Sequence, residues 1–256
     1  MRSYSNTYIF VFSSIMVIVV AAILSVAAMT LQPYQKKNVE INNKQNILTS
    51  VNIESSAKDA EALYEKYILE GFAINSKGEI KDGVDASKID MKKELAKPLE
   101  ERNLPVFISS LNDSKQYIIP VYGKGLWGPI WGYVALNNDL STIYGANFSH
   151  KAETPGLGAE IDTKDFQSKF FGKEIFNENG LFVSVSVLKG GTANPDSKYE
   201  IDGISGGTIT SVGVDEMLKD CLSSYEPYFK NLKQGIPEMI IENVTDSVSD
   251  ESQVNN

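Results

Sequence analysis

An apolar run from Ile9 to Met29 constrains this chain more than any other feature of its sequence, because the run contains no charged residue. At about 1.5 Å per helical residue it spans roughly 30 Å, the thickness of the hydrocarbon core of a bilayer. The run therefore predicts a single transmembrane helix at residues 9–29, after a short tail at 1–8. The alternative is a cleaved secretory signal, although the run is longer than an ordinary signal core and only Arg2 precedes it as a basic residue.

Composition and charge exclude several classes of function. The chain has 256 residues and a formal net charge of -9, which argues against nucleic-acid binding, since that normally requires a basic surface. It has one cysteine, Cys221, and one histidine, His150. It can therefore form no internal disulfide, and alone it cannot supply the roughly four ligands of an iron–sulfur cluster or a structural zinc site. A redox role would require an organic cofactor or partner subunits.

The segment from 30 to 115 is predicted to be a helical, membrane-proximal region. Its first helical pattern carries an apolar stripe of Ile47, Leu48 and Val51, and a second pattern has apolar residues at helical spacing over residues 57–68. Nothing in this region indicates chemistry. We expect it to be a packing element or a surface for a partner.

Residues 116–236 are predicted to form a second domain built on an antiparallel sheet. The most regular alternation lies at Leu181–Leu188, with valines on one face and serines on the other, as a half-buried strand requires. The other expected strands are Tyr117–Tyr122, Trp131–Leu136 and Thr142–Phe148.

Two helices are expected to cover this sheet, a short one at Asp165–Phe171 and a long one at Val212–Leu232. Cys221 lies on the apolar stripe of the long helix, which predicts a buried, unreactive thiol. The fold class is therefore α+β, a single transmembrane helix followed by an antiparallel sheet with packed helices. Residues 237–256 are acidic and rich in serine and asparagine, which predicts a disordered tail.

A segment of small and hydroxyl residues, Asp202–Ser211, leads into the long helix. Glycine lets a backbone approach a ligand closely, and a helix start presents unpaired N–H groups with positive partial charge. The segment predicts a phosphate-sized site beside the hydroxyls of Thr208 and Thr210. The residues alone also fit a ligand-free helix start capped by Thr210 or Ser211. Asp215 and Glu216 would then fall in the first turn and repel a phosphate.

Three other segments could carry chemistry. Gly123–Tyr133 combines two tryptophans with four glycines, which suits either a packed hairpin or a flat aromatic ligand. Pro155-Gly156 predicts a type II turn. Lys189 ends the alternating strand, where a lysine is usually solvated. The chain has no recognisable Ser-His-Asp or Cys-His arrangement and no Gly-x-Gly-x-x-Gly unit, so we expect neither a hydrolytic centre nor binding of NADH.

Together these motifs resemble those of two related families, the C subunit of the sodium-translocating NADH:quinone reductase and the G subunit of the ferredoxin:NAD oxidoreductase complex. Asp202–Thr208 resembles their Asp-Gly-x-Ser/Thr-Gly-Ala-Thr pattern, with Gly207 in place of Ala. His150–Gly158 resembles a second signature, and the Gly-Leu-Trp of Gly125–Trp127 a third. The sequence Gly-Leu-Trp-Gly-Pro and the helical region predicted between the transmembrane helix and the second domain favour the first of these families.

The resemblance implies an electron-transfer subunit that carries FMN as a phosphoester on Thr208, with Thr210 as the competing acceptor. It implies maturation by a flavin transferase, association with the other subunits of the reductase, and a soluble domain on the periplasmic side of a bacterial inner membrane. No metal site is expected, and the complete active site would need the other subunits. Other candidate flavin contacts are Trp127, Glu153, Thr154, Gly156, Leu157, Gly158, Lys189, Ser205, Gly206 and Gly207. An alternative function from another class of protein is that of a membrane-anchored binding module without a redox role.

Overall fold

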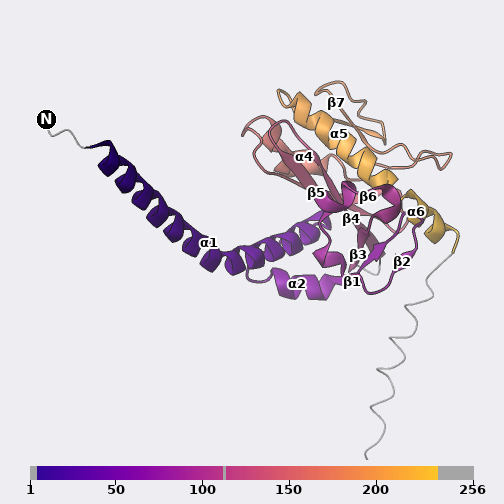
Figure 1. The fold of residues 1–256 in the computed structure, drawn as a ribbon. Helices are drawn as coiled ribbons and strands as arrows, with labels where there is room; N and C mark the ends of the chain where they lie inside the picture. The colour runs from indigo at the N-terminus through magenta and orange to yellow at the C-terminus, as the bar shows by residue number, and fades with distance from the viewer. Residues whose placement is uncertain (1–4, 112–113, 236–256) are drawn as a thin grey trace, which may run out of the picture. The chain divides into compact units, whose positions relative to one another are not determined.

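A computed structural model describes residues 5–111 and 114–235 of the protein (Figure 1). The chain divides into two compact units, Met1–Lys44 and Gln45–Asn256. The tail predicted at 237–256 lies outside the described residues, as does half of the tail predicted at 1–8.

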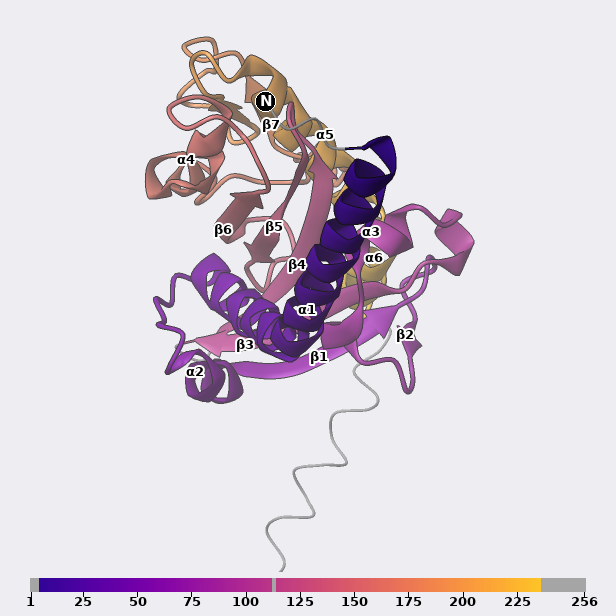
Figure 2. The same ribbon diagram turned by 60° about the vertical axis from the view of Figure 1, so that its left-hand side comes forward.

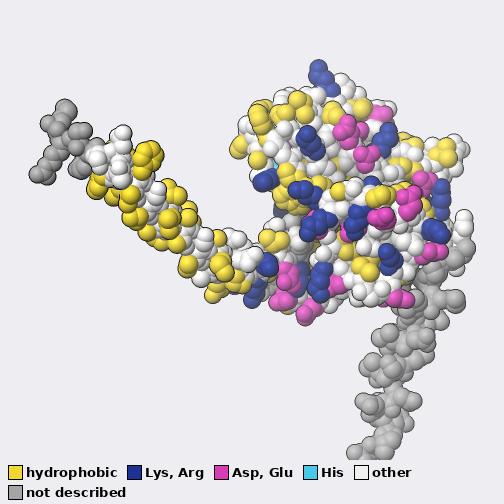
Figure 3. Space-filling model, viewed as in Figure 1, with side chains coloured by type: hydrophobic (Ala, Val, Ile, Leu, Met, Phe, Trp, Pro, Cys, Tyr) yellow, Lys and Arg dark blue, Asp and Glu magenta, His cyan; other side chains and the backbone are white. Residues whose placement is uncertain are grey.

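The first unit is the N-terminal part of helix α1 (Asn6–Ser50). Its apolar side chains are exposed along the helix (Figure 3). By length and composition this helix can cross a membrane. The prediction of an N-terminal apolar helix is confirmed, although the helix continues well beyond Met29.

Within the described residues, the second unit is built on a six-stranded antiparallel sheet of order β2-β1-β3-β4-β5-β6 (Figure 2). Three of the predicted strands are confirmed as β4, β5 and β6, and β6 forms one edge of the sheet. The strands are β1 (Ile68–Ile74), β2 (Ile80–Lys81), β3 (Leu104–Leu111), β4 (Ser114–Lys124), β5 (Pro129–Leu136) and β6 (Ile143–His150).

The prediction of a helical region over residues 30–115 is wrong for much of its length, because β1, β2 and β3 lie there and belong to the same sheet as β4. The boundary predicted at 115/116 therefore falls inside the sheet. The first six residues of β3 are all buried, and such a strand shows neither a period of two nor one of 3.6. The short helices of this region are α2 (Ala60–Tyr67), α3 (Met91–Leu95) and the 3-10 turns η1 (Ala86–Lys88) and η2 (Leu99–Glu101).

The strand predicted at Leu181–Leu188 forms only in its last part. Strand β7 (Ser186–Leu188) pairs in parallel with β8 (Glu200–Asp202), and in the described part of the chain these two make a separate sheet. Ser184 has a φ of 61° and is 3% exposed. This left-handed residue interrupts the extended backbone, so the alternating pattern before β7 runs through irregular backbone instead of a strand.

The long helix predicted at Val212–Leu232 is two helices, α5 (Thr208–Ser223) and α6 (Glu226–Lys233). The break follows from Pro227 at the start of α6, since proline lacks the N–H that a helix interior needs. Helix α5 also begins earlier than predicted, with Gly207 as its N-cap residue. Thr210 and Ser211 consequently lie inside the helix and do not cap it. The predicted short helix is confirmed as α4 (Lys164–Ser168), capped by Thr163, and it follows the 3-10 turn η3 (Gly158–Asp162).

The main core lies between the sheet and α5 and α6, and Figures 1 and 2 show α5 beside β4. Two glycines permit this close packing. A β-carbon at Gly123 would lie 2.7 Å from that of Met217, and one at Gly213 would overlap the carbonyl oxygen of Lys124. Cys221 is buried, as predicted, and its thiol donates to the carbonyl of Tyr122 at 3.4 Å.

The second core lies on the opposite face of the sheet. The predicted stripe of Ile47, Leu48 and Val51 is buried, and Ile47 and Val51 pack there with Phe107 and Ile118. Opposite faces of one sheet present alternate residues of a strand, which is why Ile118 and Ile119 belong to different cores.

Candidate functional site

Three loops that are far apart in the sequence meet at the N-terminal end of α5. They are the turn at 124–129 between β4 and β5, the loop at 151–157 after β6, and the segment 203–207 before α5. Hydrogen bonds that the carboxylate of Glu153 accepts from Trp127 and Thr210 join the first two loops to α5, and a β-carbon at Gly206 would lie 2.7 Å from the Leu157 side chain. The structure therefore brings together the three motifs from which the flavin site was predicted.

Glu153 lies at the centre of this junction and is 4% exposed. Its Oε1 accepts from the backbone N–H of Trp127 at 2.8 Å, and its Oε2 accepts from the hydroxyl of Thr210 at 2.6 Å. Over residues 5–111 and 114–235, no ion pair to this carboxylate is found. Both carboxylate oxygens thus have donors from the protein itself.

The two candidate acceptor threonines differ sharply in accessibility. Thr208 is the first residue of α5 and is exposed, whereas Thr210 is 1% exposed and bonded to Glu153. The preceding turn is closed by Ser211, whose hydroxyl accepts from the N–H of Ile204 at 2.9 Å. Of the two threonines, Thr208 is therefore the one exposed to solvent.

Several large apolar side chains of these loops and of the start of α5 are exposed. Trp127 is 66% exposed, Leu157 is 42% exposed, and Ile209 and Val212 on α5 are also exposed. A group of exposed large apolar side chains is more informative than a single one, since it marks a surface that a ligand or partner covers. This surface suits a flat, largely apolar ring.

The loop after β6 contains the predicted type II turn. The N–H of Leu157 donates to the carbonyl of Thr154 at 3.1 Å, and Gly156 has a φ of 75°. This confirms the turn, because a type II turn needs a positive φ at its third residue. The N–H of Gly156 donates to Oε1 of Glu160 at 3.0 Å, and Gly158 packs against Thr210.

Lys189 follows β7 and is exposed. The next residue, Gly190, lies beside the phosphate motif, since a β-carbon there would be 3.2 Å from the carbonyl oxygen of Gly203 and 3.6 Å from the nitrogen of Ser205. These segments line an open hollow of about 600 Å³ together with residues of η3 and α4. The carboxylate of Asp202 accepts from the N–H groups of Ala193 and Thr192, which lowers its pKa and holds the loop after Lys189 in place.

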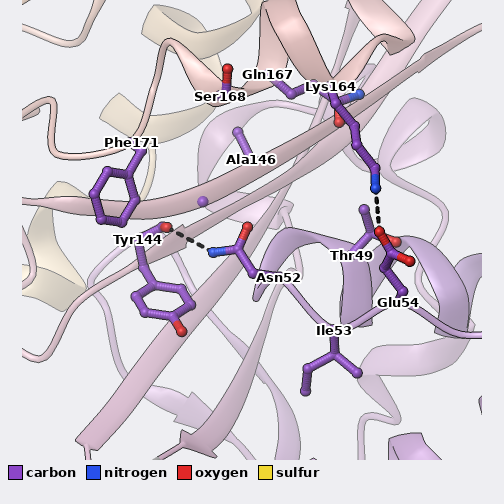
Figure 4. A pocket seen from close by; sticks show the side chains of 11 residues that line it. Thr49, Asn52, Ile53, Glu54, Tyr144, Ala146, Lys164, Gln167, Ser168 and Phe171 are labelled. Atoms are coloured by element: carbon purple, nitrogen blue, oxygen red, sulfur yellow. Dashed lines mark hydrogen bonds and ion pairs between the residues drawn. The ribbon is translucent and has the colours of Figure 1, made fainter.

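A second hollow of about 480 Å³ lies away from the three loops, beside edge strand β6 (Figure 4). The side-chain amide of Asn52 donates to the carbonyl of Tyr144 at 3.2 Å there, and Lys164 pairs with Glu54. No motif of the sequence pointed to this hollow, and none of the predicted flavin contacts lines it. Its lining is Thr49, Asn52, Ile53, Glu54, Tyr144, Gly145, Ala146, Lys164, Gln167, Ser168 and Phe171.

Comparison with known families places the three loops in one domain. The FMN-binding domain model matches residues 125–223, a range that contains all of the predicted flavin contacts. Fold and site thus define a protein with an FMN-binding domain that follows an N-terminal apolar helix.

Relatives with an assigned name narrow this class. The C subunit of the Na(+)-translocating NADH-quinone reductase from Vibrio vulnificus is 30% identical over 237 residues, which cover 85% of this chain and 92% of the relative. The same subunit from Pseudomonas aeruginosa is 28% identical, with 90% and 97% covered. The chain belongs to the family formed by the C subunits of Na(+)-translocating NADH-quinone reductases.

Solved structures agree with this assignment. The crystal structure of the C subunit from Parabacteroides distasonis is 45% identical, with a TM-score of 0.72, and the match covers 78% of this chain and 96% of that one. The Shewanella oneidensis NqrC structure, at 24% identity and a TM-score of 0.66, supports the fold alone. The predicted family, the α+β fold and membership of an oxidoreductase complex are confirmed. The individual flavin contacts stay predictions.

Proposed function

We propose that this protein relays electrons within a sodium-translocating NADH:quinone reductase through an FMN held as a phosphoester on Thr208. The observation that carries the proposal is the contrast between two hydroxyls of one motif. Thr208 is exposed at the first position of α5, inside the range matched by the FMN-binding domain, while Thr210 is buried and bonded to Glu153. Attachment by another enzyme requires an accessible hydroxyl, and Thr208 meets that requirement.

The residues around Thr208 fit the two ends of FMN. A phosphate on the first residue of α5 would lie beside the unpaired N–H groups of the first helical turn, where negative charge is favoured. The residues of this turn, all of them described, include no acidic side chain. The expected repulsion from Asp215 and Glu216 is therefore absent, because the early start of α5 moves both residues well beyond the first turn.

The ring of FMN would be held by apolar side chains and by glycine backbone. Trp127 and Leu157 offer exposed surface, and Ser205–Gly207 offers backbone without bulk. Bound FMN supplies the capacity to accept and pass on single electrons. Lys189 would place a positive charge near the reduced ring or the phosphate and so raise the potential; an unchanged flavin potential in Lys189→Ala would remove that role.

The proposal includes the context in which this relay works. A flavin transferase would attach the FMN, the other reductase subunits would donate and accept electrons, and the domain would lie on the periplasmic side of a bacterial inner membrane. Membership of the C-subunit family supports this context. The two alternative functions would give different observations. The reductase activity of a complex with a G-family subunit would depend on ferredoxin, and a binding module would never carry flavin.

The test is to co-express the full chain with a flavin transferase and measure its intact mass, followed by peptide mapping. We expect the mass of FMN on the peptide with Thr208, retained in the matched control Thr210→Val and lost in Thr208→Val. Absence of any adduct on the parent would overturn covalent attachment and favour the binding module. An adduct on Thr210 would show that the acceptor is misassigned.

A further inference from the structure

We infer that Glu153 is a positioning residue and not itself a flavin contact. Its buried carboxylate holds the turn that carries Trp127 against the first turn of α5, where Thr208 stands. The part of this inference that concerns flavin attachment to Thr208 rests on the proposed function, whereas the part that concerns the position of the turn at Trp127 does not.

The contacts of Glu153 join three separate segments. Oε1 binds a backbone N–H that lies 26 residues earlier in the chain, and Oε2 binds a hydroxyl that lies 57 residues later. The N–H of Glu153 itself donates to Nδ1 of His150 at 3.2 Å, which anchors the residue to the end of β6. One side chain therefore links the β4–β5 turn, the loop after β6 and α5.

The surrounding backbone encloses this carboxylate closely. A β-carbon at Gly125 would lie 2.6 Å from Oε1, and one at Gly158 would lie 2.6 Å from Oε2. Both are closer than real side chains approach, so the two glycines leave room for the carboxylate and for little else. The enclosure fixes the direction of both oxygens, which is the property a positioning residue needs.

A buried carboxylate must keep its hydrogen bonds, because an unpaired charge away from water is costly. Hydrogen bonds to an ionised acceptor are also stronger than those between neutral groups. The turn at Trp127 and the helix at Thr210 are therefore coupled: neither can move away without leaving an oxygen of Glu153 unpaired. Removal of the side chain should free the turn while the sheet beneath it stays folded.

The first arm of the test uses the full chain without flavin, in detergent. Trp131→Phe leaves Trp127 as the single tryptophan, and its time-resolved fluorescence anisotropy reports motion of the turn. In this background we expect Glu153→Ala to add a fast, large-amplitude decay. Glu153→Gln should largely restore the slow decay, because its amide oxygen can still accept from the N–H of Trp127. Glu160→Ala is the matched control, because it removes a nearby carboxylate that binds the N–H of Gly156 and not the turn at Trp127; its decay should resemble that of the parent.

The second arm measures FMN transfer onto Thr208 by the transferase in the same Glu153 variants. We expect Glu153→Ala to raise the KM for the acceptor protein several-fold, with recovery in Glu153→Gln. An unchanged Trp127 decay in folded Glu153→Ala, judged by circular dichroism, would overturn the inference, and unchanged transfer kinetics would overturn its link to attachment. If the parent accepts no FMN, the proposed function fails, yet the first arm still decides the role of Glu153.

Discussion

Helix α5 crosses β4 at a position where any side chain would collide with backbone, and Gly213 occupies it. A β-carbon there would overlap the carbonyl oxygen of Lys124, and it would lie 3.3 Å from the carbonyl carbon and 3.5 Å from the α-carbon of Gly125. Two effects of Gly213→Ala therefore oppose each other. Alanine favours a helix interior by about 1 kcal/mol over glycine, while the added carbon forces α5 away from the strand.

The sizes of these two effects decide whether Gly213→Ala stabilises or destabilises the protein. Restoring normal contact requires a displacement of roughly 1 Å, and neither partner is a flexible side-chain end that can rotate away. Overpacking in a core costs about 1–3 kcal/mol, and a rigid backbone contact belongs at the upper end. After the gain in helix propensity, we expect a net loss of about 2 kcal/mol in the free energy of unfolding. For a domain of this size that lowers Tm by about 4–8 °C.

The assay is urea unfolding of the full chain in detergent, followed by tryptophan fluorescence. Glu216→Ala, at an exposed position of the same helix, is the control and should change the stability by less than about 0.5 kcal/mol. If Gly213→Ala were as stable as the parent or more stable, the close approach of α5 to β4 would be wrong, and with it the placement of Thr208 beside the Trp127 turn.

Three further predictions concern single buried or bonded groups. Tyr225→Phe removes the hydroxyl that donates to the carbonyl of Pro105 at 3.0 Å and should cost about 1–2 kcal/mol in urea unfolding, since a buried acceptor loses its donor. Burial opposes ionisation of Asp139, but hydrogen bonds from Thr142 and Ser141 outweigh burial and lower the pKa of Asp139. The ionised carboxylate therefore stabilises the folded chain above about pH 4, and this stabilisation is lost as the pH falls further. Between about pH 5 and pH 3, Tm should fall less for Asp139→Asn than for the parent, and an equal fall would exclude this role. Burial raises the pKa of Cys221 to about 11, so iodoacetamide at pH 8 should label it only after unfolding; rapid labelling of the folded chain would contradict the packing of α5.

The sheet could be predicted only where its strands carry a simple pattern. Strands β4–β6 correspond to the segments Tyr117–Tyr122, Trp131–Leu136 and Thr142–Phe148 that were predicted as strands, whereas β3 is buried along most of its length and lacks a period. Strand β1 follows α2 without a breaker, since Ile68 comes directly after Tyr67. The break between α5 and α6, unlike β1 and β3, does have a local signal in the sequence, because Pro227 cannot continue a helix.

The candidate site was predicted as a set of motifs, and its internal bonds could not be. The resemblance named Glu153 as a flavin contact because it lies in a flavin-loop signature. Only the folded chain places its carboxylate between Trp127 and Thr210, since a hydrogen bond between residues so far apart depends on the packing of α5 against the sheet. No local pattern encodes that packing.

The start of α5 connects the fold to the choice of acceptor. Successive helical residues are about 100° apart around the axis, so Thr208 and Thr210 point in nearly opposite directions once both are helical. If one hydroxyl faces the core, the other must face solvent. If the helix had begun at Val212, as the apolar periodicity predicted, both threonines would lie in a loop. The helix geometry would then not require them to point in opposite directions. The N-cap at Gly207 thus separates two residues of the same type and places the exposed one where a phosphate is favoured.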